Sequence, residues 1–356
     1  MIKASAPGKL VLVGEYAVLD GAPAMAVAVD RRVHGGWQRR EDGRIVLRLT
    51  PLSEAVISLP VGSEVCWERA LGAGLDHLRP ALRALRYWIE WLQPAWLDQA
   101  HALSIDSTAL YASPEAKYGL GSSAAVAAVV GAMASLSRWD DPPKPQALHQ
   151  QLWSQWPQTR GSGLDLACAI NGGVVEYRIE PEASASAQWD TLEWPSHLQG
   201  LIVWSGESAS SPNMVGAYRA WKRDHPEAWS RHFNRLSRLA EQSTHAFKIN
   251  DMDGFFEGLT DYAQQVGTMG GLMGARVMTP MHEHLSALAS KHGVMYKPSG
   301  AGGGDVGIVL STDPEALHAM GEASTIQGLS VMPLTPTAAG LALEAPGLER
   351  KTEPRH

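Results

Sequence analysis

A glycine-rich stretch followed at once by a long run of small apolar residues constrains this chain more than any other feature. Gly119-Leu120-Gly121-Ser122-Ser123 leads into alanines and valines from Ala124 to Met133, which predicts a loop that opens directly into a helix. Glycine lets backbone N–H groups approach an anion closely, and a helix N-terminus adds free donors and partial positive charge. The serines can cap the helix or offer oxygens to a magnesium ion. The segment therefore predicts either a phosphate-binding loop or a capped core helix after a flexible turn.

Two further glycine-rich segments contain a lysine. Near the N-terminus, Pro7-Gly8-Lys9 precedes the apolar run Leu10-Val11-Leu12-Val13, and near the C-terminus stands Lys297-Pro298-Ser299-Gly300-Ala301-Gly302-Gly303-Gly304-Asp305. Phosphoryl transfer needs fixed positive charge near the moving group, and a rigid Pro-Gly turn can aim Lys9 at it. A solvated surface lysine is the alternative for Lys9. The glycines of the second segment imply a close backbone approach, with a flexible hinge as the alternative.

An aspartate follows a fourth glycine-containing turn, Gly161-Ser162-Gly163-Leu164-Asp165, ahead of an apolar run. Asp165 can cap a helix, or it can act as a general base on an alcohol acceptor. A phosphate acceptor is already largely ionised at neutral pH, with a second pKa of about 6. For such an acceptor we expect Lys9 to matter more than Asp165, because charge repulsion is then the main obstacle.

Composition excludes several classes of protein. The chain has 356 residues, enough for two domains, and a net charge of −7 without a long basic run. We therefore expect no nucleic acid and no membrane as partner. Cys66 and Cys168 are too few for a disulfide framework, and Leu10–Val13 is too short for a signal or membrane segment, so we expect a cytoplasmic protein. The histidines form no zinc motif, and His282-Glu283-His284 is expected to be an exposed helix turn.

The pattern along the chain predicts mixed strands and helices, hence an α+β fold. Short β-branched and apolar runs predict strands, at residues 10–13, 24–29, 45–49, 102–110, 172–177, 200–204, 294–297, 306–310 and 328–333. Apolar residues at three- to four-residue spacing predict helices, over residues 70–97, 122–137, 215–247, 251–269, 280–292 and 314–321. The polar stretch 179–198 is the best candidate for a domain junction, and 346–356 are predicted to form a flexible tail.

The three glycine-rich segments in this order resemble the GHMP kinases, and together they bracket residues 6–307. The resemblance implies an N-terminal domain of the ribosomal protein S5 domain 2-like type over residues 1–185 and a ferredoxin-like C-terminal domain over residues 195–345. It implies ATP and Mg²⁺ as cofactors and an active site in the cleft between the domains. Whether the chain forms a homodimer is left open.

The resemblance also assigns roles residue by residue. It implies Lys9 and Asp165 as catalytic residues, with Ser122 or Ser123 holding Mg²⁺. The residues that would bind the nucleotide are Gly119, Leu120, Gly121, Ser122, Ser123, Ala124, Gly302 and Gly303. The residues that would bind the substrate are Tyr16, Lys117, Ser210, Ser211, Gly300 and Ala301, with Arg219 as a further candidate for its phosphate.

Several details resemble phosphomevalonate kinases within this family. They are Lys117-Tyr118, the segment from Trp204 to Ser211, and Asp305 at the end of the third glycine-rich segment. The resemblance thus implies transfer of the ATP γ-phosphoryl group to 5-phosphomevalonate. The tight connection Asp20-Gly21-Ala22-Pro23 is closer to mevalonate kinases, which leaves a mevalonate hydroxyl as the alternative acceptor.

A mevalonate-3-kinase or decarboxylase-like relative is a more distant candidate, as is a GHMP-fold sensor that binds a ligand without turnover. Mevalonate kinases also carry a magnesium-binding glutamate about eleven residues before the aspartate, where this chain has Ser154. Magnesium is therefore expected to be held differently here, or the chain belongs to a different subfamily.

Overall fold

The computed structural model describes residues 1–51, 57–61, 99–138, 144–154, 161–180 and 186–345. The predicted helix over residues 70–97, Cys66 and the predicted tail at 346–356 lie outside these residues. Within them the chain combines two larger sheets with helices, so the α+β prediction is confirmed.

The first sheet is built around two long antiparallel strands, β1 (Ile2–Val13) and β2 (Ala24–Arg39). One half of β2 pairs with β8 (Val174–Ile179) and the other half with β5 (His101–Asp106). The sheet continues through further strands, namely β3 (Arg44–Thr50), β4 (Ile57–Pro60), β9 (Ala187–Leu192) and β14 (Ala342–Glu344). A separate hairpin, β6 (Tyr111–Ser113) with β7 (Ala116–Lys117), leads toward the first predicted phosphate loop.

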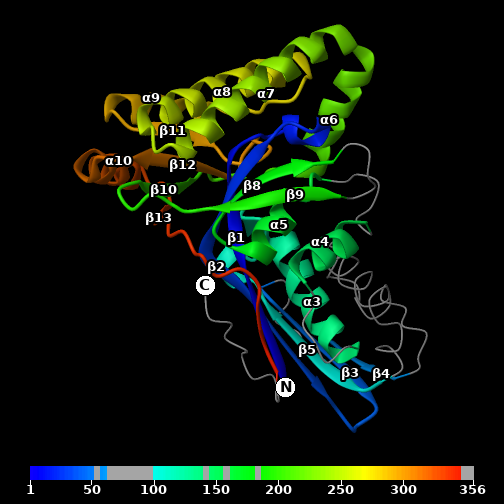
Figure 1. The fold of residues 1–356 in the computed structure, drawn as a ribbon. Coiled ribbons are helices and arrows are strands. Elements are labelled where there is room, and N and C mark those ends of the chain that lie inside the picture. The colour runs from blue at the N-terminus through cyan, green and yellow to red at the C-terminus, as the bar shows by residue number, and fades with distance from the viewer. Residues whose placement is uncertain (52–56, 62–98, 139–143, 155–160, 181–185, 346–356) are drawn as a thin grey trace.

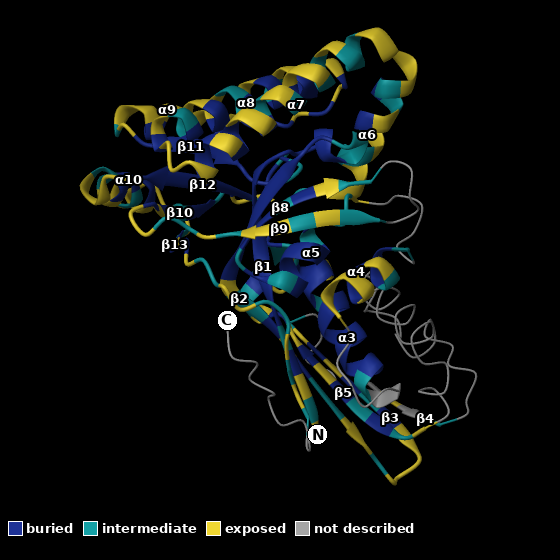
Figure 2. Cartoon of the chain, in the orientation of Figure 1, coloured by how far each residue is buried: buried dark blue, intermediate teal, exposed yellow. Residues whose placement is uncertain are grey.

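Helices α3 (Ser122–Arg138) and α5 (Leu164–Asn171) pack on β1 and β2, and α4 (Pro145–Ser154) packs on both helices (Figure 1). The small side chains of α3 let it approach the sheet closely. A Cβ on Gly35 of β2 would lie 2.4 Å from Val129 Cγ1, so a side chain there would push α3 away. Most residues of α3 and of the facing part of β1 are buried (Figure 2).

The second sheet has the strand order β11-β12-β10-β13 and is antiparallel throughout. Its strands are β10 (Gln199–Trp204), β11 (Met295–Pro298), β12 (Val306–Ser311) and β13 (Val331–Pro333). Its helices are α6 (Ser211–Asp224), α7 (Pro226–Lys248), α8 (Met252–Leu272), α9 (Pro280–Lys291) and α10 (Pro314–Ile326). A strand–helix–strand–strand–helix–strand order is ferredoxin-like, as predicted.

Three predictions from the pattern need correction. The helix predicted over residues 215–247 is two helices, because Pro226 begins α7 and cannot continue the hydrogen bonding of α6. The predicted irregular junction at 179–198 contains β9, which pairs with β8 and extends the first sheet. The strand predicted over 102–110 ends at Asp106 and is followed by a short 3-10 turn, η4 (Thr108–Leu110).

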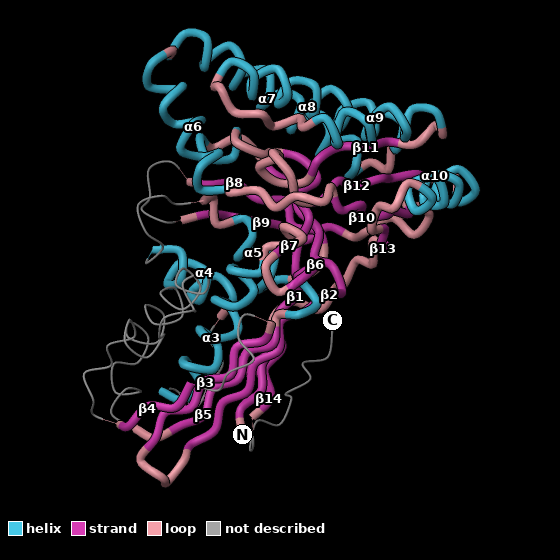
Figure 3. The backbone as a smooth tube through the Cα atoms, turned by 180° about the vertical axis from the view of Figure 1, so that it is seen from behind, coloured by secondary structure: helices cyan, strands magenta, loops and turns pink. Residues whose placement is uncertain are grey.

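The chain returns to the first sheet at its end. Residues Lys3–Ser5 of β1 pair with β14, so both ends of the described chain meet in one sheet, as the view from behind shows (Figure 3). The division into domains at 1–185 and 195–345 stays a prediction, to which the structure adds that β9 and β14 belong to the first sheet. In the described part of the chain, no helix combines the length and apolar character that a bilayer crossing requires.

Candidate active site

The lysine of the N-terminal glycine-containing segment and the aspartate of the 161–165 turn form an ion pair. Lys9 lies in the middle of β1, and its backbone N–H donates to the Leu120 carbonyl at 2.9 Å. Its ammonium lies 3.3 Å from Oδ1 of Asp165, which stands in the first turn of α5. The Lys9 side chain is 7% exposed and that of Asp165 is 45% exposed. One partner is therefore fixed in the protein and the other is open to a ligand.

The predicted phosphate loop covers this pair. Gly121 has φ +75°, and a Cβ there would lie 3.0 Å from Lys9 Cγ and 3.7 Å from Asp165 Oδ2. A side chain at position 121 would thus strain the loop and crowd both charged groups. The first turn of α3, which begins at Ser122, contains no acidic residue. Its N–H groups and partial positive charge are suited to phosphate.

The two serines of the loop differ in their surroundings. Ser122 is buried. Burial raises the pKa of Tyr111, and the side chains of Ser122 and Ser107 oppose that rise. Ser123 is exposed. Of the two predicted magnesium ligands, Ser123 is the one whose hydroxyl is open to a ligand.

The third loop also lies next to Lys9. Ser299 joins it to β1, because its Oγ accepts from the Val11 N–H at 2.9 Å and donates to the Val11 carbonyl at 3.2 Å. A Cβ on Gly300 would lie 3.8 Å from Lys9 Nζ. The buried Tyr16 donates from its hydroxyl to the Ala301 carbonyl. Tyr16 therefore holds this loop, and its direct contact with substrate stays a prediction.

Gly302 and Gly303 face a different neighbour. A Cβ on Gly302 would lie 2.5 Å from Val277 Cγ1, and one on Gly303 would lie 3.3 Å from Met214 Cε. The Gly303 N–H also donates to the Val277 carbonyl at 2.9 Å. Both glycines thus pack against the segment between α8 and α9, and their role in binding nucleotide stays a prediction.

Asp305 is the residue of the third segment that reaches the phosphate loop. A Cβ on Gly119 would lie 2.5 Å from Asp305 Oδ2, and Asp305 itself has φ +59°. Its Oδ1 accepts from the Ala209 N–H at 2.9 Å. Burial raises the pKa of Asp305, while the hydrogen bond from Ala209 and the charges of Lys9 and Lys117 oppose that rise. From the sequence, Asp305 was only a mark of family resemblance, and the structure adds it to the site.

Lys117 is half-buried beside this carboxylate. Its ammonium lies 5.8 Å from the centroid of the Tyr111 ring, and burial lowers the pKa of Lys117 against the opposing effect of Asp305. Ser208 Oγ accepts from the Lys117 N–H at 3.1 Å and donates to its carbonyl at 3.0 Å. The segment that leads to α6 is therefore attached to the strand that carries Lys117.

The predicted substrate serines lie at the beginning of α6. Ser210 is the N-cap residue and Ser211 the first residue of the helix, and both are exposed. Arg219 is exposed further along α6. Asp20 anchors this helix near the site, because its carboxylate pairs with Lys222 and accepts from the Tyr218 hydroxyl at 2.6 Å.

A buried ion pair between Lys297 and Glu15 lies next to the third loop. This pair was not singled out from the sequence. Lys297 Nζ lies 2.5 Å from Glu15 Oε1, and these side chains are 2% and 5% exposed. The lysine also donates to the Pro298 carbonyl at 2.7 Å, and the Gly300 N–H donates to Glu15 Oε1 at 3.4 Å. The sequence feature that could have indicated a buried lysine is its position directly after the apolar Val294-Met295-Tyr296, within a predicted strand.

His282 does not lie on an exposed turn, contrary to the prediction. Its side chain is buried, with Nδ1 2.6 Å from the Tyr296 hydroxyl and Nε2 2.9 Å from the Gly304 carbonyl. Glu283 and His284 are exposed. Of these three polar residues, His282 is the one on the buried face of α9, and its contact with the Gly304 carbonyl supports the third loop.

The residues present fit a magnesium ion held mainly by phosphate. Among the described residues, no three His, Cys, Asp or Glu side chains are grouped to hold a metal. Mg²⁺ bound to a nucleotide needs only one or two protein oxygens, which Ser123 and Asp165 can offer. Ser154, at the position of the missing glutamate, ends α4 and donates to the Gln151 carbonyl at 2.8 Å.

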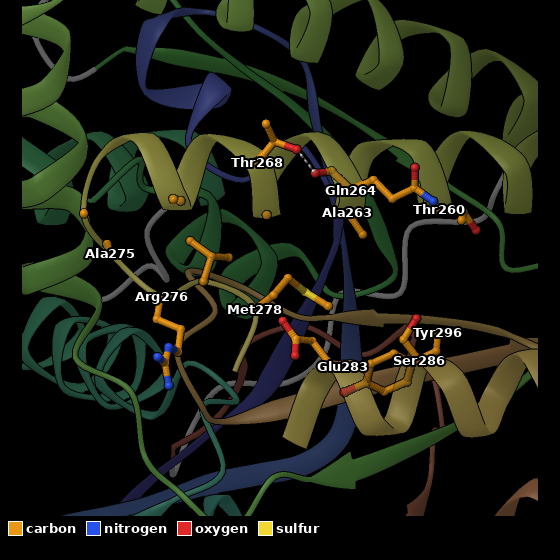
Figure 4. A pocket seen from close by; sticks show the side chains of 15 residues that line it. Thr260, Ala263, Gln264, Thr268, Ala275, Arg276, Met278, Glu283, Ser286 and Tyr296 are labelled. Atoms are coloured by element: carbon orange, nitrogen blue, oxygen red, sulfur yellow. Dashed lines mark hydrogen bonds between the residues drawn. The ribbon is translucent and has the colours of Figure 1, made fainter. Parts of the chain in front are cut away.

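A groove lies behind the third loop, between α8, α9 and the segment that joins them (Figure 4). Its volume is about 640 Å³. Polar side chains at its rim include Gln264, Thr268, Arg276 and Glu283. Val277 lines the groove and also contacts Gly302, so this segment separates the groove from the third loop.

Comparison with known proteins gives similar chains of nearly equal length. The chain is 27% identical to a phosphomevalonate kinase of Streptomyces sp. (strain CL190), over 94% of this chain and 97% of the relative. It is 26% identical to a mevalonate kinase of Thermococcus sibiricus, over 68% of each chain. The structure matches Streptococcus pneumoniae phosphomevalonate kinase in complex with phosphomevalonate and AMPPNP, with a TM-score of 0.72, 19% identity and coverage of 94% and 100%. No protein-family model matches the chain.

Proposed function

The chain belongs to the GHMP kinase superfamily, and from this premise we propose that it transfers the γ-phosphoryl group of ATP to 5-phosphomevalonate, giving 5-diphosphomevalonate. The phosphomevalonate kinase relative, which aligns over nearly the full length of both chains, supports this acceptor.

The observation that carries the proposal is the presence of two lysines at the phosphate loop. The Lys9 N–H donates to the Leu120 carbonyl of this loop, and the half-buried Lys117 stands two residues before Gly119. A reaction between two phosphates brings several negative charges together, and fixed cations are needed to offset their repulsion. A hydroxyl acceptor brings less negative charge to the transferred group, so it depends less on a second lysine. The exposed N-terminus of α6 adds a further place for an anionic group.

In this proposal each group has a defined task. The N–H groups at the start of α3 and the glycine loop would hold the ATP phosphates, and Ser123 would offer an oxygen to the accompanying Mg²⁺, which would offset phosphate charge. Lys9 stabilises the charge on the transferred group, and Asp165 orients Lys9. Lys117, Ser210 and Ser211 position the acceptor.

The test is ADP release by the purified protein with Mg-ATP, with 5-phosphomevalonate and mevalonate offered in separate reactions. Turnover with 5-phosphomevalonate alone is the expected result, and turnover with mevalonate alone would overturn the proposal. Lys117→Gln should raise the KM for the phosphorylated acceptor roughly tenfold or more, since it removes one charge-assisted contact. Lys291→Gln, an exposed lysine in the last turn of α9, is the matched control and should leave the KM unchanged.

Mevalonate kinase is the second candidate. Relatives with that name align with this chain, and Asp165 is exposed enough to take a proton from a hydroxyl acceptor. In that case Lys117→Gln should have little effect, and mevalonate should be the better acceptor. A protein that binds ATP but releases no ADP with either compound would be a non-catalytic member of the superfamily or would use another acceptor.

A further inference from the structure

Three consecutive carbonyls in the turn before α5 each face a different buried aromatic side chain. Trp153 Nε1 donates to the Gly161 carbonyl at 3.2 Å, and the Tyr177 hydroxyl donates to the Ser162 carbonyl at 2.7 Å. His149 Nε2 lies 3.0 Å from the carbonyl of Gly163. We call these three side chains the aromatic clamp.

The clamp is assembled from separate elements. Trp153 and His149 are four residues apart on α4, so they lie on one face of that helix, whereas Tyr177 comes from β8. Their exposures are 5%, 1% and 0%. The His149 ring lies 5.5 Å from the ring of Trp153 and 6.0 Å from that of Tyr177. Because the rings pack on one another, the donors are fixed in place.

The chemistry of each contact is defined. A carbonyl oxygen can only accept, so the hydrogen of the neutral His149 ring is on Nε2. The Gly163 carbonyl also accepts from the Ala167 N–H at 2.9 Å, as the first hydrogen bond of α5. Gly163 has φ +81°, and a Cβ there would lie 2.8 Å from the Tyr177 hydroxyl. The clamp thus fixes both the turn and the direction in which α5 begins.

Asp165 stands two residues after this turn, and its carboxylate reaches Lys9 from the exposed side of the site. Its side chain is nearly half exposed, so contacts of its own do not hold it rigidly. A displacement of the helix start by a fraction of an ångström would move the carboxylate away from Lys9. A small misalignment of reacting groups can lower the reaction rate by a large factor.

We propose that His149 and Tyr177 are positioning residues for the phosphoryl transfer, which they support by holding the 161–163 turn so that Asp165 meets Lys9. The inference rests on the proposed kinase function. It concerns groups that do not touch the nucleotide or the acceptor, and it ties the geometry of the ion pair to an aromatic cluster behind it.

The first test uses two variants that keep an aromatic ring at each position and remove its donor, His149→Phe and Tyr177→Phe. Each should lower kcat roughly tenfold while the KM for ATP changes less than about twofold, because binding groups are untouched and alignment is lost. Ser324→Ala is the control. It removes another buried hydroxyl that donates to a carbonyl, Met320 at 2.9 Å in α10, and kcat should not change. Equal kcat in all three variants and the wild type would overturn the proposal.

A double-mutant cycle separates positioning from a general loss of structure. In an Asp165→Asn background, His149→Phe should lower kcat further by less than about twofold, because the group through which it acts is already gone. If the two effects multiply, His149 does not act through Asp165 and the proposal fails.

Hydrogen exchange gives a readout that needs no turnover. The amides of residues 164–168 should exchange faster in His149→Phe and Tyr177→Phe than in the wild type, while those of α10 should not change. Unchanged exchange at 164–168 would overturn the clamp even if the kinase function holds. Faster exchange in a protein without turnover on either acceptor would support the clamp while the proposed function fails.

Discussion

Lys9 and Asp165 form an ion pair at 3.3 Å in which the cation is buried in β1 and the anion is nearly half exposed at the start of α5. Without its partner the buried lysine would be left as an uncompensated charge, whereas the aspartate is exposed enough to contact a ligand as well. Such an asymmetric pair suits a site where one charge must stay in place while a substrate comes and goes.

The two members of this pair should contribute differently to turnover. With a phosphate acceptor, Lys9→Ala should lower kcat by roughly 10³-fold or more, because it removes fixed charge from the transferred group. Asp165→Asn should cost less, since no proton has to be removed; loss of a general base would cost roughly 10²–10⁴-fold. ADP release with 5-phosphomevalonate measures both. Equal and complete loss in the two variants would contradict a phosphate acceptor.

Gly121 should tolerate no side chain. Gly121→Ala places a Cβ 3.0 Å from Lys9 Cγ at a φ of +75°, so ATP turnover should fall sharply and thermal stability should decrease. Gly216→Ala in α6 is the matched change, because a Cβ there has nothing within 4 Å. That variant should keep its turnover and gain up to about 1 kcal/mol of stability from helix propensity. Similar behaviour of the two variants would show that the loop does not lie over the ion pair.

The buried pair of Lys297 and Glu15 should dominate the electrostatic part of stability near the site. Lys297→Met leaves a carboxylate that is 5% exposed without its cation, which should lower the free energy of unfolding by about 3–5 kcal/mol. Glu15→Gln together with Lys297→Met should recover part of this loss, because no buried charge remains. Urea unfolding at neutral pH measures the differences.

A surface pair provides the comparison for that experiment. Arg178 and Glu241 lie 3.6 Å apart with side chains 53% and 55% exposed, so Glu241→Gln should change the free energy of unfolding by less than about 0.5 kcal/mol. A Lys297→Met variant as stable as Glu241→Gln would mean that the internal pair is not formed.

Burial lowers the pKa of His149 to about 4. The unfolded value is near 6.5, so the neutral ring is favoured in the folded protein. Stability from this group is complete above about pH 6.5 and is lost as the pH falls toward about 4. Between about pH 7.5 and about pH 5 the free energy of unfolding should fall by about 2 kcal/mol more in the wild type than in His149→Phe.

Urea unfolding at several pH values tests this difference. Carboxylates titrate in both proteins, and so do His101 and His282, whose pKa values burial also lowers. The contribution of His149 therefore appears as the difference between the two curves. Parallel curves would show that the ring is not buried in its neutral form.

Local sequence determined most elements and the order of the motifs. The Ala/Val run after Ser123 is long enough and small enough to be a helix packed on a sheet, and it forms α3. Predictions were wrong where local pattern is ambiguous: the apolar spacing continues across His225 and Pro226 although the helix does not. The strand β9 lies in a polar stretch and is stabilised by its pairing with β8, which no local pattern reveals.

The sequence by itself also predicted which residues would carry the chemistry, namely the glycines, the lysine and the aspartate of these motifs. Only the tertiary structure decided how they are arranged. It brought Gly300 and Gly121 next to Lys9, set Asp305 beside Gly119, and buried Glu15, Lys297, His149 and His282 as supports. Burial and proximity depend on how distant segments pack, and the identity of a side chain does not reveal which charge will lose its water.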